Sequence, residues 1–441
     1  MIEILNIILQ FIIFLSLFSF PFCLYKKKIF LIPDRFIIDG TFLKIGINII
    51  IHANILLVIS FINIDTQLYF YLIVLLSILS NVIFIYNDEK FDLKFNDIVI
   101  FLVFIIFTLG FFFKIATDLK LEWDGLNHWF PKALNFFNDL NIKNLNEMGF
   151  SEYPHLGPYI WAFFWKNSYL EYEYFGRLFY VYFYVTSLFC VFENQFNKNI
   201  ILKIIFIFLL SIITFDLYLF GGYQGYLIFS ILIILSKLMY EENFKGKIVS
   251  RPLLFYFFII YIFHLIIWFK DEGIFYYIFT LILFIFFLNI NKKYFLYLLC
   301  ISFVVLQVIL QKFLIGTYGF QAEIIHEGLF ENLKPNIFMM KLLLISKYIF
   351  ISIIKYKLWI INLFSLSILF LFFKKEFSKL KMWFYILVIN FLFIYAIYIH
   401  TPYDLEFLLK VTLDRVMFHT SGLYLIFTVV LLEKISFRKD N

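Results

Sequence analysis

The sequence predicts an all-α protein, a polytopic membrane helix bundle of about thirteen transmembrane helices. Of the 441 residues, 63% are hydrophobic and only 15% are charged, whereas soluble domains carry roughly 25% charged residues. Apolar runs of roughly 20 residues, the length that crosses a bilayer as a helix, recur along the chain. Because backbone groups in lipid must bond within their own segment, we expect these runs to be helical.

The runs that meet this length define the expected spans, which are residues 4–24, 45–64, 67–86, 97–116, 173–192, 201–220, 223–240, 253–270, 274–290, 294–313, 358–373, 382–400 and 417–433. We therefore divide the chain into three parts. They are N-terminal transmembrane helices (1–116), a partly helical outer loop with an acidic motif (117–172), and a helix bundle (173–441) with outer loops 314–357 and 401–416.

Basic residues predict the orientation, since Lys and Arg gather in cytoplasmic loops. They cluster in segments 26–44, 245–251, 292–293, 374–381 and 434–439. Placing all five in the cytoplasm puts the C-terminus inside and the large loops outside. We expect a multi-pass protein of a bacterial cytoplasmic (inner) membrane with its chemistry on the periplasmic face. The net charge of +6 follows from these clusters and gives no argument for nucleic acid.

Segment 337–357 is apolar but holds four lysines. A span there would move the 374–381 lysines to the outside. We therefore expect a helix in the outer interface, with its lysines reaching toward lipid headgroups.

The motif EWDGLNHW in the first outer loop offers Glu122 and Asp124 beside two tryptophans. A carboxylate at a membrane-edge cavity can serve as the general base for an acceptor hydroxyl. The nearby cations His128 and Lys132 would tune its pKa, together with partial desolvation. The alternative is an interfacial aromatic loop whose charges are simply solvated.

Two shorter motifs also face the predicted outer side. In SEYPHLGP (151–158), Tyr153 and His155 are candidates for a cavity wall, and the alternative is a rigid entry into a helix. In KDEG (270–273), Asp271 and Glu272 could bind a cation or position an acceptor. A polar turn between two spans explains KDEG equally well.

The motif TPYDLEFLLKVTLDR (401–415) is dense in charge. Arg415 is our candidate for a phosphate group, because a guanidinium holds phosphate oxygens bidentately. At helical spacing Asp414 could pair with Lys410, and a short amphipathic surface helix is the alternative. His52 and His264 are expected to be buried and hydrogen-bonded. No Walker A loop, Rossmann glycine pattern or HExxH motif occurs, so direct use of a cytoplasmic nucleotide is unsupported.

Together these residues resemble bacterial integral-membrane glycosyltransferases of the GT-C superfamily. The resemblance extends to the protein mannosyltransferase-like families that use dolichyl-phosphate-mannose and to the aminoarabinose transferase-like families. The matching pieces, in their order and outer placement, are WDGLNHWFPKA (123–133), YPHLGPYIWA (153–162), KDEG (270–273) and TPYDLEFLLKVTLDR (401–415).

The resemblance implies transfer of a sugar from a polyprenyl-phosphate-linked donor to a lipid, glycan or protein acceptor, with membrane lipids as surroundings and no nucleic acid. Asp124, with Glu122 beside it, would act on the acceptor hydroxyl. Arg415 would stabilise the lipid phosphate, with Lys410 and Lys132 as second candidates. We assign to the substrate pocket His128, Trp129, Tyr153, His155, Asp271, Glu272, Tyr403 and Asp404.

Two questions stay open at this point. Some GT-C enzymes use a divalent metal such as Mg²⁺ or Mn²⁺, and Asp124 with Glu122 or Asp271 could supply oxygen ligands. The outer turn GGYQGY (221–226) carries Gln224 where relatives carry an acid. The alternative function is a transporter or flippase of lipid-linked saccharides, for which polar residues near the bilayer midplane are typical.

Overall fold

The structure is a computed structural model that describes residues 2–21, 40–62, 66–87, 95–139, 141–151, 153–193, 199–216, 220–244, 253–288, 293–315, 335–401 and 404–437. These residues form helices, turns and short connections, with no strand among them. The predicted all-α class is therefore confirmed for this part of the chain.

The long helices follow the predicted apolar runs, because each run ends where charged, polar or glycine residues begin. In chain order they are α1 (Ile2–Leu17), α2 (Thr41–Ile62), α3 (Thr66–Asn87), α4 (Phe95–Thr117), α7 (Tyr174–Val191), α8 (Ile200–Thr214), α10 (Gly225–Phe244), α11 (Leu253–Phe263), α12 (Gly273–Phe287), α13 (Lys293–Ile315), α15 (Pro335–Lys355), α16 (Lys357–Phe372), α18 (Lys381–His400) and α21 (Leu425–Phe437). The shorter helices are α5 (Phe130–Phe137), α6 (Leu156–Lys166), α17 (Lys374–Lys379), α19 (Leu405–Leu408) and α20 (Asp414–Ser421).

Among the described residues, 7 helices are long and apolar enough to cross a membrane. They are α2, α4, α7, α13, α15, α18 and the continuous run Leu405–Ile435. Other apolar helices, including α8, α12 and α16, have only 10–17 residues. The chain is thus an all-helical protein of membrane type, and the count of thirteen spans stays a prediction.

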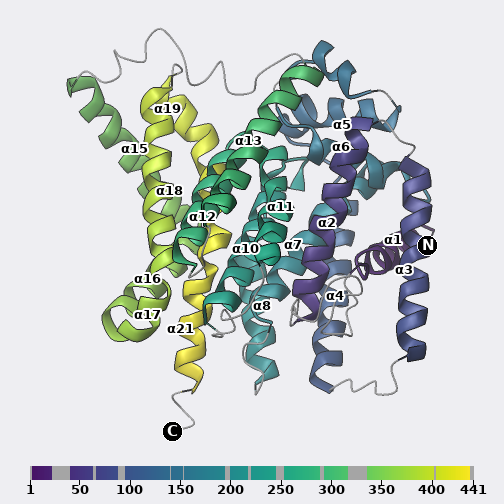
Figure 1. Ribbon diagram of the computed structural model, residues 1–441, viewed down its shortest axis with the longest axis horizontal. Helices are drawn as coiled ribbons and strands as arrows, with labels where there is room; N and C mark the ends of the chain where they lie inside the picture. The colour runs from purple at the N-terminus through teal and green to yellow at the C-terminus, as the bar shows by residue number, and fades with distance from the viewer. Residues whose placement is uncertain are drawn as a thin grey trace.

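The polar outer segments gather at one end of the bundle. Figure 1 shows α5, α6 and α19 at the upper end, and α17 with the end of α21 at the lower end. We call these the upper and lower ends. The predicted outer loops 117–172 and 401–416 therefore share one end, and the lysines of 374–381 lie at the other. Which end faces the cytoplasm stays a prediction.

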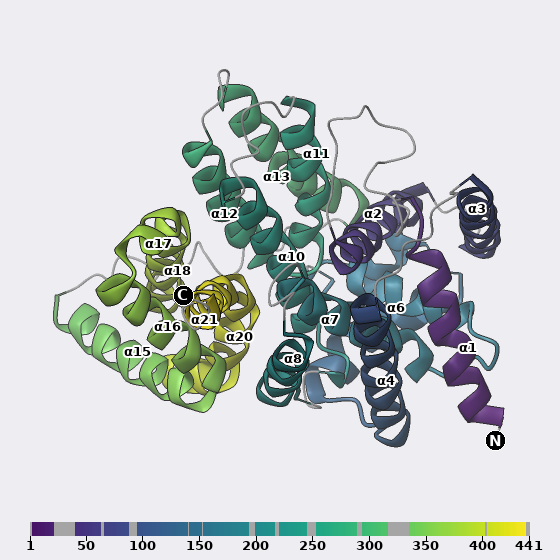
Figure 2. The same cartoon turned by 90° about the horizontal axis from the view of Figure 1, so that it is seen from below.

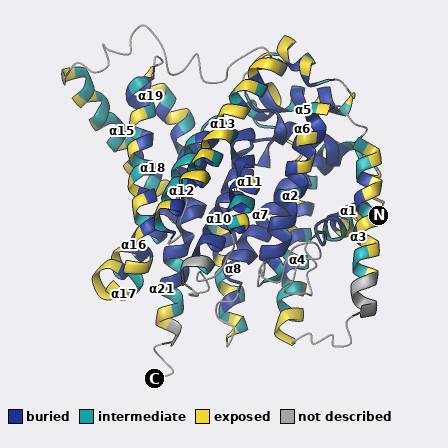
Figure 3. Cartoon of the chain, viewed as in Figure 1, coloured by how far each residue is buried: buried dark blue, intermediate teal, exposed yellow. Residues whose placement is uncertain are grey.

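Helix α7 forms the centre of the fold, since all of its residues are buried. It packs against α2, α4, α6 and α10. Figure 3 shows the middle of the bundle, around α7 and α10, mostly in the colour of burial. Its tyrosines are internal: Tyr184, for example, bonds the Thr214 hydroxyl of α8 at 2.6 Å. This rigid centre holds the upper loops in place.

Helix α1 does not stand upright among its neighbours. Figure 1 views α1 along its axis, and Figure 2 shows it lengthwise. It has 16 residues, which at about 1.5 Å per residue gives a length near 24 Å, shorter than the roughly 30 Å of hydrocarbon. Phe14 packs on Phe164 of α6 with ring centroids 4.9 Å apart. The prediction of a full span at 4–24 is therefore not supported.

Helix α15 covers most of segment 337–357. Its length and composition place it among the seven membrane-length helices, although we predicted an interfacial position. Its Lys341 ammonium donates to Ile399 O at 3.1 Å, and its Tyr348 hydroxyl donates to Glu406 at 3.0 Å. Figure 2 shows α15 lengthwise at the edge of the molecule. These contacts lie at the upper end, and the interfacial position stays a prediction.

Candidate functional site

The structure brings together two charged residues that lie 291 positions apart in the sequence: the Arg415 guanidinium donates to the Asp124 carboxylate. Asp124 precedes the wide helical turn Gly125–Trp129, and Arg415 lies in the first turn of α20. Their side chains are 18% and 12% exposed, so the pair is sheltered yet reachable. We predict that Asp124, Arg415 and Tyr153 line one outer cavity. The contact of the two charged side chains agrees with this, and the shared cavity stays a prediction.

Glycines allow the two loops beneath this pair to touch. The Glu122 amide donates to Gly221 O at 2.9 Å. A Cβ added to Gly125 would lie 2.0 Å from Gly221 O, so no larger residue fits. Gly222 has a φ of +98° and faces the Gly125 Cα, a conformation that favours glycine. The segment that carries Asp124 is therefore fixed against the segment that carries Tyr223.

Tyr223 supports the cation of the pair. The Arg415 guanidinium carbon lies 5.1 Å from the centroid of the Tyr223 ring, within the range of a cation–π contact. The adjacent Gln224 is buried, donates to Gly222 O at 3.1 Å and accepts from the Tyr180 hydroxyl at 3.2 Å. Gln224, at the position where relatives carry an acid, therefore stabilises the conformation of this loop through its hydrogen bonds.

Lys270 is the residue that sequence reasoning missed. It lies in the turn before α12 and is partly buried. Burial lowers the pKa of Lys270, the Glu272 carboxylate opposes this change, and Arg415 lowers the pKa further. The Asp124 and Asp271 carboxylates also act on Lys270. The charges of Lys270, Arg415, Asp124, Asp271 and Glu272 thus act on one another. The KDEG motif alone did not show that Lys270 interacts with Asp124 and Arg415.

Aromatic rings enclose the other side of Asp124. The His128 Nε2 lies 3.9 Å from the Asp124 carboxylate. The His128 ring contacts Phe150, with centroids 3.8 Å apart, and Tyr153 at 5.5 Å. The predicted pocket residues His128 and Tyr153 therefore adjoin Asp124, and Tyr153 does so through His128.

Lys132 faces the interior instead of the ion pair. Its Nζ donates to Tyr153 O at 2.6 Å and lies 5.9 Å from the ring centroids of Trp129 and Tyr153. Lys132 and Trp129 are both buried. The wide turn after Asp124 directs these side chains inward, so this geometry favours a structural role over phosphate binding for Lys132.

Three further candidates have local structural partners. Lys410 pairs with Glu406 at 2.9 Å on the exposed surface. The predicted pair between Lys410 and Asp414 is wrong, because Asp414 accepts from Ser352 and Lys355 of α15. Asp404 caps α19 by accepting from the Phe407 amide at 2.7 Å.

Glu122 pairs with Lys120 at 3.0 Å, so its carboxylate has a different partner from that of Asp124. Glu272 immediately precedes α12, and its carboxylate, like that of Asp271, acts on the charge of Lys270. Tyr403 lies outside the described residues.

His155 is fully buried, and its Nε2 bonds the Ser60 hydroxyl at 2.8 Å. Burial lowers the pKa of His155 to about 3, and the Lys132 charge adds to the effect. His155 is therefore neutral and joins the loop to α2. His52 is also buried and bonded, to Tyr69 at 3.1 Å and to Phe20 O at 2.9 Å, as predicted.

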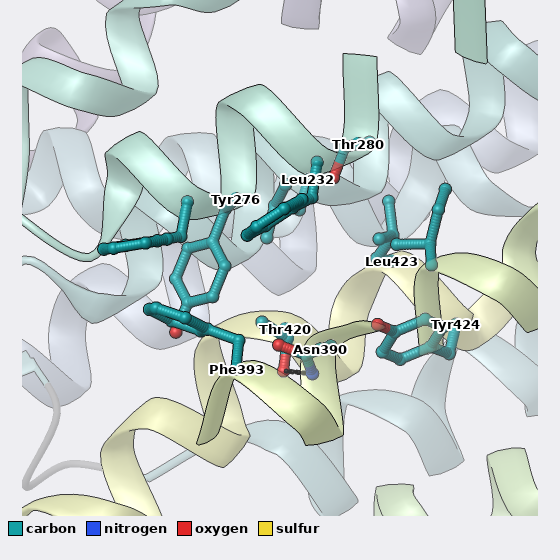
Figure 4. Close-up of a pocket in the computed structure, with 11 residues that line it drawn as sticks. Leu232, Tyr276, Thr280, Asn390, Phe393, Thr420, Leu423 and Tyr424 are labelled. Carbon is teal, nitrogen blue, oxygen red and sulfur yellow. Dashed lines mark hydrogen bonds between the residues drawn. The ribbon is translucent and has the colours of Figure 1, made fainter. Parts of the chain in front are cut away.

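A small cavity of about 20 Å³, roughly the space of one water molecule, lies below the charged cluster, inside the helical region. Figure 4 shows its lining, which is mostly aromatic and aliphatic with a polar wall where Asn390 donates to Thr420 at 3.1 Å. Tyr276 lines the cavity, and its amide bonds Glu272 O at 3.3 Å. The cavity thus begins one helical turn from the charged cluster.

Metal use stays open. In the part of the chain that the structure describes, no three His, Cys, Asp or Glu side chains gather as a metal site. The Asp124 carboxylate instead holds a guanidinium.

Comparison of the chain with protein-family models, with characterised proteins and with solved structures gave no match.

Proposed function

We propose that this chain is a membrane glycosyltransferase of GT-C type, which transfers a sugar from a polyprenyl-phosphate-linked donor to an acceptor at the outer face of the cytoplasmic membrane. The observation that carries the proposal is the reachable pair of Asp124 and Arg415, within electrostatic range of Lys270 and above a largely apolar cavity. A carboxylate, two cations and an apolar cavity at membrane level match the chemistry of a lipid-phosphate donor.

In the proposed reaction the bond between the sugar anomeric carbon and the phosphate oxygen breaks. The acceptor oxygen bonds that carbon, its proton passes to Asp124, and the polyprenyl phosphate leaves with the electron pair. Asp124 is thus the general base, a role that contributes roughly 10²–10⁴-fold. Arg415 and Lys270 stabilise the phosphate, and such donors supply about 3–4 kcal/mol each in a sheltered site.

The resting ion pair fits this sequence of events. The donor phosphate would replace the Asp124 carboxylate on the Arg415 guanidinium, because phosphate and carboxylate both accept from its fork. Asp124 would then be free to accept the acceptor proton. Binding and activation of the base are thereby coupled.

The cavity below the pair supports a lipid-linked donor. Phe275, Phe279 and Phe393 line it on the α12 and α18 sides, and burial of apolar chain against such walls yields roughly 25 cal/mol per Å². We place the isoprene units nearest the phosphate along these side chains, which must move apart to admit them because the cavity has only about 20 Å³.

The test is transfer from a polyprenyl-phosphate sugar by the purified protein in liposomes. Asp124→Asn removes the charge at constant size and is expected to lower transfer by at least about 10²-fold. Asp139→Asn is the matched control, because Asp139 lies in the same loop and pairs with Lys166 on the exposed surface; it should transfer like wild type.

Three outcomes would contradict parts of the proposal. Equal transfer by Asp124→Asn and wild type would remove Asp124 as base, and loss in Glu122→Gln would then move the role to Glu122. If wild type moves the lipid-linked sugar across the bilayer without transfer, the alternative holds and the chain is a transporter or flippase. No transfer and no movement would remove both.

A further inference from the structure

Arg177, in the first turn of α7, has a fully enclosed guanidinium. Its side chain is 1% exposed, which is costly for a charge unless it is paired and hydrogen-bonded. Nε and Nη2 donate to the Glu173 carboxylate at 2.8 and 2.9 Å. Glu173 therefore neutralises the charge, and the donors that remain are directed elsewhere.

Those donors reach two separate loops. Nη2 donates to Leu119 O at 3.3 Å, and Nη1 donates to Phe220 O at 3.3 Å and to Lys120 O at 3.5 Å. One rigid fork on the central helix thus joins the loop after α4 to the loop before α10.

These two loops carry the parts of the candidate site. Lys120 comes four residues before Asp124, and Phe220 comes three residues before Tyr223. Beyond Arg177 the loops continue in contact through the Glu122 amide on Gly221 O. Asp124 binds Arg415, while Tyr223 lies under the same guanidinium. The separation of the two loops therefore determines where the carboxylate sits relative to the cation.

We propose that Arg177 is a positioning residue for sugar transfer. It holds the Asp124 segment and the Tyr223 segment at the spacing that aligns Asp124 with the acceptor hydroxyl and Arg415 with the phosphate. The inference rests on the proposed function for its catalytic consequence. The tie between the loops is a separate claim that can be measured without activity.

Arginine suits this role because its planar fork offers five N–H donors in fixed directions. Arg177→Lys keeps the charge near Glu173, but a single ammonium cannot reach all three carbonyls and the carboxylate. Displacement of a catalytic group by about 1 Å costs roughly 10²-fold in rate. We expect kcat to fall about 10²-fold in Arg177→Lys, whereas KM for the donor changes less than about 3-fold because Arg415 and Lys270 are retained.

Glu173→Gln is the second variant. It keeps an acceptor for Arg177 and removes the neutralising charge, so the fork is weakened without a change of size. We expect an intermediate fall in kcat. Lys237→Met is the matched control, because Lys237 is as deeply buried but donates to Val191 O and Glu193 O at the lower end. It should lower thermal stability and leave kcat of the folded protein unchanged.

Two readouts separate the claims. Amide hydrogen exchange in wild type and variants reports the tie: Arg177→Lys should lose protection in 119–126 and 220–226 only. Transfer kinetics report the catalytic consequence, and Arg177→Lys should add no further loss on an Asp124→Asn background.

The proposal is overturned if exchange in these two loops is unchanged, or if kcat is unchanged while the loops loosen. It is also overturned if Arg177→Lys raises exchange throughout the bundle, as a purely structural residue would. If wild type itself transfers no sugar, the proposed function fails, and local exchange still decides whether Arg177 ties the loops.

Discussion

Two buried cations, Lys237 at the lower end of the bundle and Arg415 at the upper end, have different hydrogen-bond partners. At the lower end, Lys237 is 2% exposed and lies 3.7 Å from the Glu241 carboxylate. Its direct hydrogen bonds go to two backbone carbonyls, Val191 O at 3.4 Å and Glu193 O at 2.6 Å. At the upper end, Arg415 is 12% exposed and pairs with a side chain, that of Asp124. A backbone carbonyl cannot leave its cation unless the chain unfolds locally, whereas a carboxylate can rotate away.

Glu193 extends the contrast. Its carboxylate accepts from the amides of Phe42 and Leu43 at 2.9 and 2.8 Å and so caps the start of α2. Burial raises the pKa of Glu193 to about 7, although the two amides oppose this change. Lys237 and Glu193 thus both make their direct hydrogen bonds to the backbone, and these bonds stabilise helix ends. The Asp124–Arg415 pair joins two side chains, so a ligand for Arg415 can replace the carboxylate.

The largest expected effect comes from exchanging one cation at each end for methionine. Arg415→Met should lower kcat/KM for transfer by about 10³-fold and cost only about 1 kcal/mol of stability, because the pair is partly solvated. Lys237→Met should leave kcat of the folded protein unchanged and cost roughly 3 kcal/mol, since it strands buried acceptors. Liposome kinetics and thermal unfolding in detergent measure the two quantities.

The proposed difference between Arg415 and Lys237 is wrong if Arg415→Met mainly lowers stability and Lys237→Met mainly lowers transfer. A strong loss of stability in Arg415→Met with normal kinetics would make the upper pair a structural tie like the lower one. Arg415→Lys serves as a control for charge, and should recover part of the binding but lose the bidentate geometry.

The second prediction compares two lysines, Lys270 near the ion pair and Lys203 at the lower end, in their effect on donor binding. Lys270→Met should raise KM for the donor by about 10–100-fold, as expected for loss of one charge-assisted contact to phosphate. Lys203→Met is the control, because Lys203 is buried near Glu193 at the lower end. Equal KM values in Lys270→Met and wild type would remove Lys270 from the donor site.

Much of the helical framework could be predicted, since hydrocarbon thickness sets the length of an apolar run. Each predicted span has a helix, including α13 at 293–315 for the run 294–313. The resemblance assigned Asp124 and Arg415 to one reaction, and the two side chains are in contact. Run length could not predict direction, and α1 lies across its neighbours because its Phe side chains pack on α6 and α7.

Side-chain direction within the loops was not predictable from spacing. An α-helical register would place Lys410 and Asp414 on one face, but a π-helical turn at Leu409–Leu413 changes that register. Asp414 then meets Lys355, which lies 59 positions earlier. Lys132 and Lys270 both lie near acids in the sequence. Only packing decides that Lys132 bonds Tyr153 O, while Lys270 lies within electrostatic range of Asp124 and Arg415.

The third prediction concerns the pH dependence of stability that arises from His155, a fully buried group at the upper end. The folded pKa of His155 is about 3, below its ordinary 6.5, so the unfolded state binds more protons between these values. Stability is therefore present above pH 6.5 and falls as pH drops toward 3. From pH 7 to pH 5 the loss should be about 2 kcal/mol. Thermal unfolding across this window measures it.

His155→Gln is the control for this slope, because the amide can still donate to Ser60 but does not titrate. The variant should lose less stability than wild type between pH 7 and pH 5. If stability depends on pH equally in wild type and His155→Gln, His155 is solvated in the folded protein and its burial here is wrong.

The smallest effect is expected at α15, whose Lys355 is 61% exposed and pairs with Asp414, next to Arg415. Lys355→Cys should cost only about 0.5 kcal/mol, since exposed pairs are weak. With the three native cysteines replaced, a membrane-impermeant maleimide should label position 355 from outside and Lys434→Cys only after permeabilisation. If position 355 is labelled only from the side of the membrane that also labels position 434, the interfacial position of α15 is wrong. Helix α15 would then cross the membrane.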